Sequence, residues 1–390
     1  MVIKVSAEGK DRKAMDNFKK YFRKFDAVIF LSMTILICVG LYCIRQVDIL
    51  NEDGGLYTKQ LMGVAIGFLI IFAMMFIDYH LICNFSYVFY IGIIIILTYL
   101  LIFGKSLNNV KRWITVAGIQ FQPSELTKVV IILFLAFLCN RFKDQLGKLY
   151  TFLILATVTA VPVILIILEP HFSSSLAVLF IFCVIVYSSG IRYKVIGTVF
   201  AIIAPLVVGV IIGITIFGIK LPFIEEYQIQ RVLSFMSTDE SEDAAGKYQQ
   251  NQALVAIASG GLHGKMISED NSTRNYGGIY ANESDFIFSV VGEEFGFVGT
   301  GMIIFLYFIL IIRCLIIASH APDYMGRLIC IGVSALLIFQ IMVNVGVATS
   351  ILPNTGLALP FISYGLTSLI STMIAVGLVL KVGLSRTIQL

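Results

Sequence analysis

Residues 150–168 read YTFLILATVTAVPVILIIL, an uninterrupted apolar run without a charged side chain. A helix needs about 20 predominantly apolar residues to cross the roughly 30 Å hydrocarbon core of a bilayer, and this run has that length. Nine other runs of similar character lie at 26–45, 59–77, 80–103, 125–139, 174–190, 195–218, 284–312, 326–350 and 360–382. The sequence therefore predicts an all-α polytopic membrane protein with ten transmembrane helices.

The composition of the whole chain agrees with a membrane location. Of its 390 residues, 58% are hydrophobic and only 13% are charged, whereas a soluble domain carries about 25% charged residues. This balance excludes an ordinary soluble globular protein, a disordered chain and a nucleic-acid-binding module. The first 25 residues are charged and lead into no cleavage site, so we expect the first run to remain as an uncleaved anchor.

The distribution of positive charge predicts the orientation of the chain. If the N-terminus is cytoplasmic, the cytoplasmic segments hold most of the 28 lysine and arginine residues, as the positive-inside rule requires. We therefore expect both termini inside, with residues 1–25 as a cytoplasmic tail and 26–390 as a single ten-helix membrane domain. One long polar loop, 219–283, would lie outside between the seventh and eighth helices. Its stretches VLSFM and QNQALVAIASGG suggest short amphipathic helices on the membrane surface.

Ionisable residues at membrane depth mark candidate functional sites, because each costs roughly 2.5–3.5 kcal/mol to insert. The first cluster is KRWITVAGIQFQPSELTKVV at 111–130. Glu125 and Lys128 lie three residues apart, on one helical face, where each reduces the cost of burying the other. Pro123 suits a helix start and Ser124 could cap it. The cluster opens with Lys111, Arg112 and Trp113. An interfacial anchor with a structural ion pair is an equally good interpretation.

The second cluster is YANESDFIFSVVGEEFGFVGTG at 280–301. On a helix, Asp285, Ser289 and Glu293 would line one stripe. The spacing of Gly292 and Gly296 would let another helix approach closely. Asp285 could act as a general base at the outer face of the membrane, or simply cap the helix, and the local sequence leaves both open.

Three further stretches have weaker signals. In ILEPHFSSSLAV, Glu169 and His171 could bind a divalent cation such as Mg²⁺ or Mn²⁺, although two ligands do not define a metal site. Lys265 ends the glycine-rich stretch GGLHGK, which lacks the spacing of a phosphate loop but could still contact a phosphate. The stretch LPNTGLALPFISYG at 352–365 predicts irregular backbone that is buried or lines a cavity.

Three of these stretches resemble one family. KRWITVAGIQFQPSELTK is similar to the RWI…FQPSEL.K signature of the SEDS family of bacterial cell-wall polymerases, the RodA, FtsW and SpoVE proteins. ASGGLHGK and ESDFIFSVVGEEFGFVG resemble its GGL.GK…TDFIF..IGEE.GF.G block. NVGVATSILPNTGLALPFISYGLTSL resembles its N.G...G.LP.TG.PLPF.SYGG.SL block. The short N-terminal tail and compact C-terminus favour the RodA-like branch.

The resemblance implies a peptidoglycan glycosyltransferase. Such an enzyme polymerises lipid II into β-1,4 glycan strands at the outer face of the bacterial cytoplasmic membrane and releases undecaprenyl diphosphate, for cell elongation or division. Its expected partners are a class B penicillin-binding protein, which is a transpeptidase, and other elongasome or divisome proteins. No cofactor is certain, and a divalent cation at Glu169 and His171 is the one considered.

The resemblance also assigns the site residues. Asp285 matches the essential aspartate of the family, so we predict it as the catalytic base. Glu125 and Lys128 match the pair that lines the central cavity. The cationic side chains would stabilise the departing diphosphate. The predicted substrate-binding residues are Lys111, Arg112, Trp113, Glu125, Lys128, Lys265 and Ser289.

Some positions depart from the family pattern. EPHFSSS stands where relatives carry a QPDLGT-like stretch, so His171 replaces an acidic residue. Leu366 replaces the second glycine of SYGG, and the lead-in to the aspartate is Ala281-Asn282-Glu283-Ser284. Two alternative functions stay open: a flippase for lipid-linked precursors, or a non-catalytic scaffold that recruits a transpeptidase through the Gly292–Gly296 face and loop 219–283.

Overall fold

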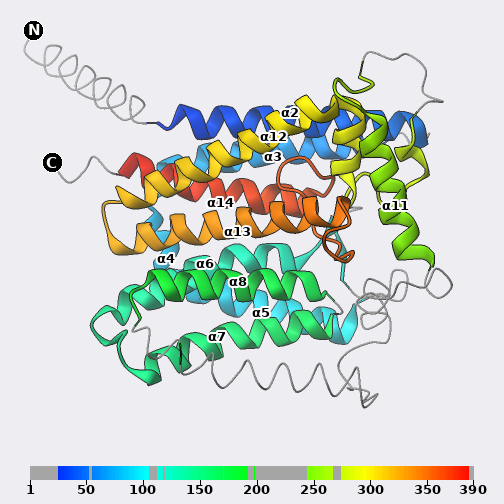
Figure 1. Cartoon of the computed structure of the whole chain (residues 1–390). Coiled ribbons are helices and arrows are strands. Elements are labelled where there is room, and N and C mark those ends of the chain that lie inside the picture. The colour runs from blue at the N-terminus through cyan, green and yellow to red at the C-terminus, as the bar shows by residue number, and fades with distance from the viewer. Residues whose placement is uncertain are drawn as a thin grey trace, which may run out of the picture.

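The computed structural model describes residues 25–51, 55–104, 112–116, 119–169, 171–191, 197, 244–266 and 274–385. Within these residues the chain is mostly helical (Figure 1). Among the described residues, eight helices are long and apolar enough to cross a membrane: α2 (Ala27–Asn51), α3 (Leu56–Phe76), α5 (Ser86–Phe103), α6 (Pro123–Arg141), α7 (Leu149–Leu168), α12 (Ile287–Ser319), α13 (Tyr324–Ala348) and α14 (Leu366–Ser385). The expectation of a polytopic helical membrane protein is confirmed.

The helix positions follow the apolar runs of the sequence closely. A ninth apolar helix, α8 (Phe172–Ser188), is shorter and matches the run at 174–190. The run at 195–218 lies outside the described residues except for position 197, so the count of ten stays a prediction. The run at 80–103 is divided into α4 (Tyr79–Asn84) and α5, because the chain turns at Phe85 between them.

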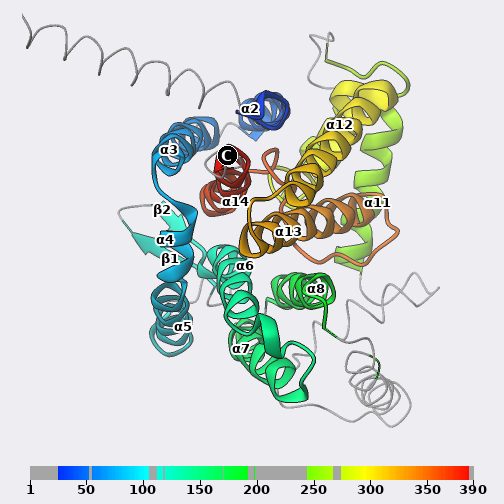
Figure 2. The ribbon, with the colours of Figure 1, turned by 90° about the vertical axis from the view of Figure 1, so that its left-hand side faces the viewer.

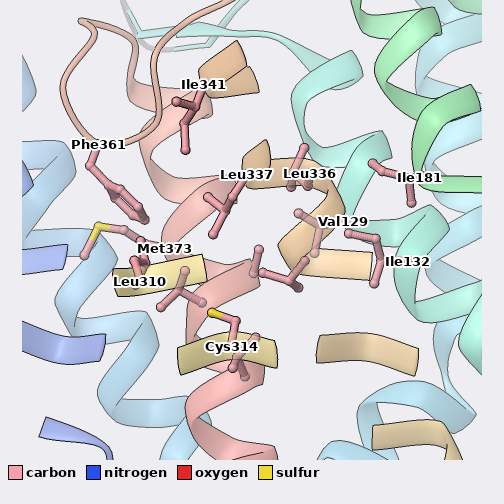
Figure 3. Packing of buried hydrophobic residues seen from close by; sticks show 14 of the residues in the cluster. Val129, Ile132, Ile181, Leu310, Cys314, Leu336, Leu337, Ile341, Phe361 and Met373 are labelled. Carbon is pink, nitrogen blue, oxygen red and sulfur yellow. The ribbon is translucent and has the colours of Figure 1, made fainter. Parts of the chain in front are cut away.

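The long helices lie side by side in one bundle, with α6, α13 and α14 in its interior (Figure 2). α13 packs against α6, α8, α12 and α14, while α14 packs against α3 and α6 as well. Buried residues from these helices interlock at the centre, including Val129 and Ile132 from α6 and Leu336, Leu337 and Met373 from α13 and α14 (Figure 3). The peripheral helices expose large apolar side chains outward, as lipid-facing helices do.

Short elements close one end of the bundle. Strands β1 (Ile114–Val116) and β2 (Ile119–Phe121) form an antiparallel hairpin between α5 and α6. Helix α11 (Ala244–Ser259) crosses this end and packs against α12 (Figure 1). It confirms a helix in QNQALVAIASGG, whereas VLSFM lies outside the described residues. Single turns occur at η1 (Lys143–Gln145) and η3 (Tyr276–Gly278).

Two predicted helix starts need correction. α6 begins at Pro123 as expected, but Gln122 is its N-cap, and Ser124 turns its hydroxyl toward His171 instead of capping the helix. α12 begins at Ile287 with Phe286 as N-cap. Asp285 therefore lies in the turn before α12, and it neither caps the helix nor shares a helical stripe with Ser289 and Glu293.

The glycine pair of α12 receives another segment of the same chain. At Gly296 the helix is kinked, with φ 65° and ψ −169°. A Cβ on Gly296 would lie 2.3 Å from the backbone nitrogen of Gly264, and one on Gly292 would lie 2.9 Å from the Ile257 side chain. Close approach at this pair was predicted correctly. The segment that approaches, however, is the end of α11 and the glycine turn after it, so this face is already covered.

Candidate active site

A buried ion pair lies in the first turn of α6. The Nζ of Lys128 is 2.6 Å from the Oε1 of Glu125, and the two side chains are only 1% and 5% exposed. The i,i+3 pair is thus present as predicted. The Oε2 of Glu125 is buried and has no hydrogen-bond partner among the described residues. A buried carboxylate oxygen without a donor is costly, and an ionisable group at membrane depth is a candidate functional residue.

His171 lies in the connection between α7 and α8, beside this pair. Its Nδ1 contacts the Gln122 Nε2 at 3.2 Å and the Ser124 Oγ at 3.0 Å, and its Nε2 contacts the Ser174 Oγ at 3.3 Å. An amide nitrogen can only donate, so Nδ1 accepts and the ring is neutral with its proton on Nε2. Burial holds the pKa of His171 well below its usual value, and the nearby charges of Arg112 and Lys128 add to this effect.

These hydrogen bonds bear on the expected cation. Both ring nitrogens of His171 are occupied, so a metal ion there would have to displace Gln122 or Ser174. Across the described parts of the chain, no group of three or more His, Cys, Asp or Glu side chains could hold a metal ion. A cation at Glu169 and His171 stays a prediction.

Arg112 and Glu169 form the next part of the cluster. The Arg112 Nε donates to the backbone oxygen of Glu169 at 3.3 Å. The Glu169 side chain is 1% exposed, and neither carboxylate oxygen has a hydrogen-bond partner within the described residues. Burial raises the pKa of Glu169 to about 8, and the Arg112 charge offsets only part of that rise. A Glu169 carboxyl group that is protonated near neutral pH adds no negative charge beside Arg112.

The turn at Gly356 contacts both Asp285 and His171 of this cluster. Gly356, between α13 and α14, has φ +70°, and a Cβ there would lie 3.2 Å from the Asp285 Oδ2. The backbone of Gly356 also hydrogen-bonds the His171 ring. Asn344 of α13 holds both sides of the turn, since its Nδ2 donates to the backbone oxygens of Asp285 at 2.9 Å and Leu357 at 2.7 Å. The irregular backbone predicted at 352–365 is present, and it brings the Asp285 carboxylate to the buried cluster.

Other predicted residues lie elsewhere. The Lys265 Nζ is 2.6 Å from the Glu293 Oε1 and 3.0 Å from the Ser259 Oγ, in a separate polar cluster. Ser289 is fully buried and donates to the backbone oxygen of Phe286 at 2.6 Å. Lys111 lies outside the described residues. Trp113 lines a cavity of about 400 Å³.

The separate cluster contains residues that the sequence analysis did not assign. Glu293 accepts hydrogen bonds from the backbone nitrogens of Asn275 and Tyr276 at 2.9–3.1 Å. Glu294 accepts from the Arg274 Nε at 2.6 Å and from the Tyr276 hydroxyl at 2.7 Å. Both glutamates are fully buried. They hold residues 274–276, which precede Asp285 in the chain, against α12. Two adjacent glutamates within an apolar run are the sequence signal that could have predicted this role.

Comparisons with known proteins agree on one family. The family described as cell cycle protein, which comprises FtsW, RodA and SpoVE, matches residues 22–388. A probable peptidoglycan glycosyltransferase FtsW from Geobacter sp. (strain M18) is 29% identical over 369 residues, which are 92% of this chain and 96% of that protein. Stage V sporulation protein E of Bacillus subtilis is 29% identical over 366 residues, again 92% and 96%. A probable peptidoglycan glycosyltransferase FtsW from Enterococcus hirae is 32% identical over 302 residues, or 76% of this chain and 74% of that protein.

Solved structures share the fold. The crystal structure of Thermus thermophilus rod shape determining protein RodA aligns with a TM-score of 0.66 and 26% identity. A chain from a structure described as structural coordination of polymerization and crosslinking by a peptidoglycan synthase complex aligns with a TM-score of 0.76 and 26% identity. Each alignment covers 93% of this chain and 98% of the other. The names include FtsW, SpoVE and RodA, so the RodA-like branch stays a prediction.

Proposed function

Because the chain belongs to the family of cell cycle proteins that comprises FtsW, RodA and SpoVE, we propose that it is a peptidoglycan glycosyltransferase that polymerises lipid II. Relatives across almost its whole length are named peptidoglycan glycosyltransferases. The observation that carries the proposal is the position of Asp285. Its carboxylate lies against Gly356, the residue whose backbone bonds His171 beside Arg112 and Lys128. A carboxylate base and two cations are thus gathered at one end of the bundle.

The proposed reaction uses these groups in one inverting displacement. The acceptor sugar hydroxyl gives its proton to the Asp285 carboxylate while its oxygen attacks the anomeric carbon of the donor. The new β-1,4 bond forms as the bond between that carbon and the diphosphate oxygen breaks. The electron pair leaves with undecaprenyl diphosphate, whose charge Arg112 and Lys128 stabilise. Glu125 orients the Lys128 ammonium through its 2.6 Å contact.

The membrane arrangement is part of the proposal. We place the chain in the bacterial cytoplasmic membrane with ten helices, both termini inside, residues 1–25 as a tail and 26–390 as one domain. Loop 219–283 and the end that bears Asp285 would then lie outside, where lipid II is polymerised. One solved relative belongs to a complex described as coordinating polymerization and crosslinking. A class B penicillin-binding protein is therefore the proposed partner, with other elongasome or divisome proteins.

The deciding experiment measures polymerisation of labelled lipid II by the purified protein, with and without a class B partner. Asp285→Asn should lower the rate by about 10²–10⁴-fold, the usual contribution of a general base. Asp323→Asn is the matched control, because Asp323 caps α13 away from the site and asparagine caps helices equally well. Normal polymerisation by a folded Asp285→Asn protein would remove the catalytic assignment. No polymerisation by the wild type with any partner would remove the enzyme.

A further inference from the structure

A second compartment lies beside the proposed catalytic aspartate. It is a cavity of about 400 Å³, within the range of small-molecule sites. Its walls come from the start of α3, the β hairpin, the turn before α12 and the start of α14. Its polar and aromatic lining consists of Lys59, Trp113, Gln120, Glu283, Ser284 and Tyr364.

This cavity shares its walls with the buried cationic cluster. Three segments each send one residue into the cavity and a near neighbour toward the cluster. The pairs are Trp113 and Arg112, Gln120 and Gln122, and Ser284 and Asp285. The cavity therefore borders the three segments that carry the cluster, and Ser284 in its wall directly precedes Asp285 in the chain.

The walls of the cavity are held together by hydrogen bonds. The backbone nitrogen of Tyr364 donates to the backbone oxygen of Glu283 at 2.8 Å, and the Ser363 hydroxyl donates to the backbone oxygen of Ser284 at 2.7 Å. Gln60 of α3 is buried and bonds this loop through both ends of its amide. The cavity is thus preformed, so binding does not have to order its walls.

We propose that this cavity binds the acceptor sugar, a pyranose ring that carries hydroxyl and N-acetyl groups. The indole and phenol rings of Trp113 and Tyr364 offer apolar faces with polar edges. Glu283 accepts hydrogen bonds from hydroxyl groups, Lys59 donates them, and Gln120 does both. The opposite charges of Lys59 and Glu283 balance within the cavity, which suits a neutral sugar, whereas the Arg112 guanidinium in the neighbouring cluster attracts a diphosphate. This inference rests on the proposed glycosyltransferase function.

Trp113 provides a direct measurement, because it is the single tryptophan of the chain. The purified full-length protein is titrated with N,N′-diacetylchitobiose, a neutral disaccharide that ends in N-acetylglucosamine, and the tryptophan emission is recorded. We expect a saturable change whose half-saturation concentration rises at least tenfold in Glu283→Gln and in Lys59→Met. Lys148→Met is the matched control, since Lys148 lies near the Tyr150 ring and outside the cavity, and it should titrate like the wild type.

Polymerisation of lipid II by the same samples separates this inference from the proposed function. A protein that polymerises lipid II but shows no saturable response, or the same response in both cavity variants, overturns the sugar site and leaves the enzyme. A response that weakens in both variants of a protein that makes no glycan supports the sugar site and removes the enzyme. In an active protein, Glu283→Gln should raise the KM for lipid II more than it lowers kcat.

Discussion

Gly356→Ala tests how the Asp285 carboxylate is positioned. Gly356 has φ +70°, and an added Cβ would lie 3.2 Å from the Asp285 Oδ2, so the carboxylate would have to give by a few tenths of an ångström. The left-handed backbone adds about 1–2 kcal/mol of strain for a residue with a Cβ. A misplacement of 1 Å can cost about 10²-fold in rate. Because the shift is a fraction of 1 Å, we expect a loss of polymerisation of about 10-fold, with a loss of stability of about 1–2 kcal/mol.

Gly190→Ala separates backbone strain from displacement of the carboxylate. Gly190 also lies in the left-handed region, with φ +81°, but a Cβ there would meet nothing within 4 Å among the described residues. It should show a similar loss of stability, measured by thermal unfolding in detergent, and keep the wild-type rate of lipid II polymerisation. If Gly356→Ala polymerises as fast as Gly190→Ala, the contact with Asp285 does not position the base and the reasoning is wrong.

Three further predictions concern buried carboxylates. Lys128→Met leaves the Glu125 carboxylate buried without its cation and should lower the free energy of unfolding by about 3–5 kcal/mol. Adding Glu125→Gln to the same chain should restore most of this loss in thermal unfolding. An unchanged melting temperature of Lys128→Met would contradict the prediction. Burial raises the Glu169 pKa to about 8 in the folded protein. Between about pH 4.5 and pH 8 the folded protein therefore keeps a proton on Glu169 that the unfolded chain has lost. The free energy of unfolding should fall by about 1.4 kcal/mol per pH unit as the pH rises through this range. Glu169→Gln should lack that slope in unfolding at pH 5 and pH 8, and equal slopes would refute the assignment. Glu293→Gln should destabilise the protein more than Lys265→Met does, because Glu293 also receives backbone N–H groups; the reverse order in thermal unfolding would show that the ion pair dominates.

Two departures from the family pattern have structural consequences. His171, at which the resemblance predicted an acidic residue, is neutral and held through both ring nitrogens, and its bond to Gly356 helps to place the turn against Asp285. Glu283 belongs to the altered lead-in before the aspartate and lines the cavity next to Trp113. The scaffold alternative depended on loop 219–283 and on the face at Gly292 and Gly296, and this face is covered by the chain itself.

The sequence by itself determined where the helices lie and which ion pair the first cluster contains. Apolar runs of spanning length became helices because backbone groups in lipid must bond within their own segment. Glu125 and Lys128 met because residues three apart always share a helical face. The helix start at Pro123 followed for the same local reason.

Only the tertiary structure decided how the candidate site is assembled. Asp285 does not share the predicted helical stripe with Ser289 and Glu293. The chain turns at Ala281, which has φ 59°, and α12 begins two residues after Asp285. Its contact with Gly356, and the bond from Gly356 to His171, join segments that are far apart in sequence. Lys265 pairs with Glu293 and lies apart from the proposed diphosphate-binding groups, because the turn at Gly264 packs on the kink of α12 at Gly296. Such pairings depend on which surfaces pack together, and the period of hydrophobic residues along the chain carries no information about them.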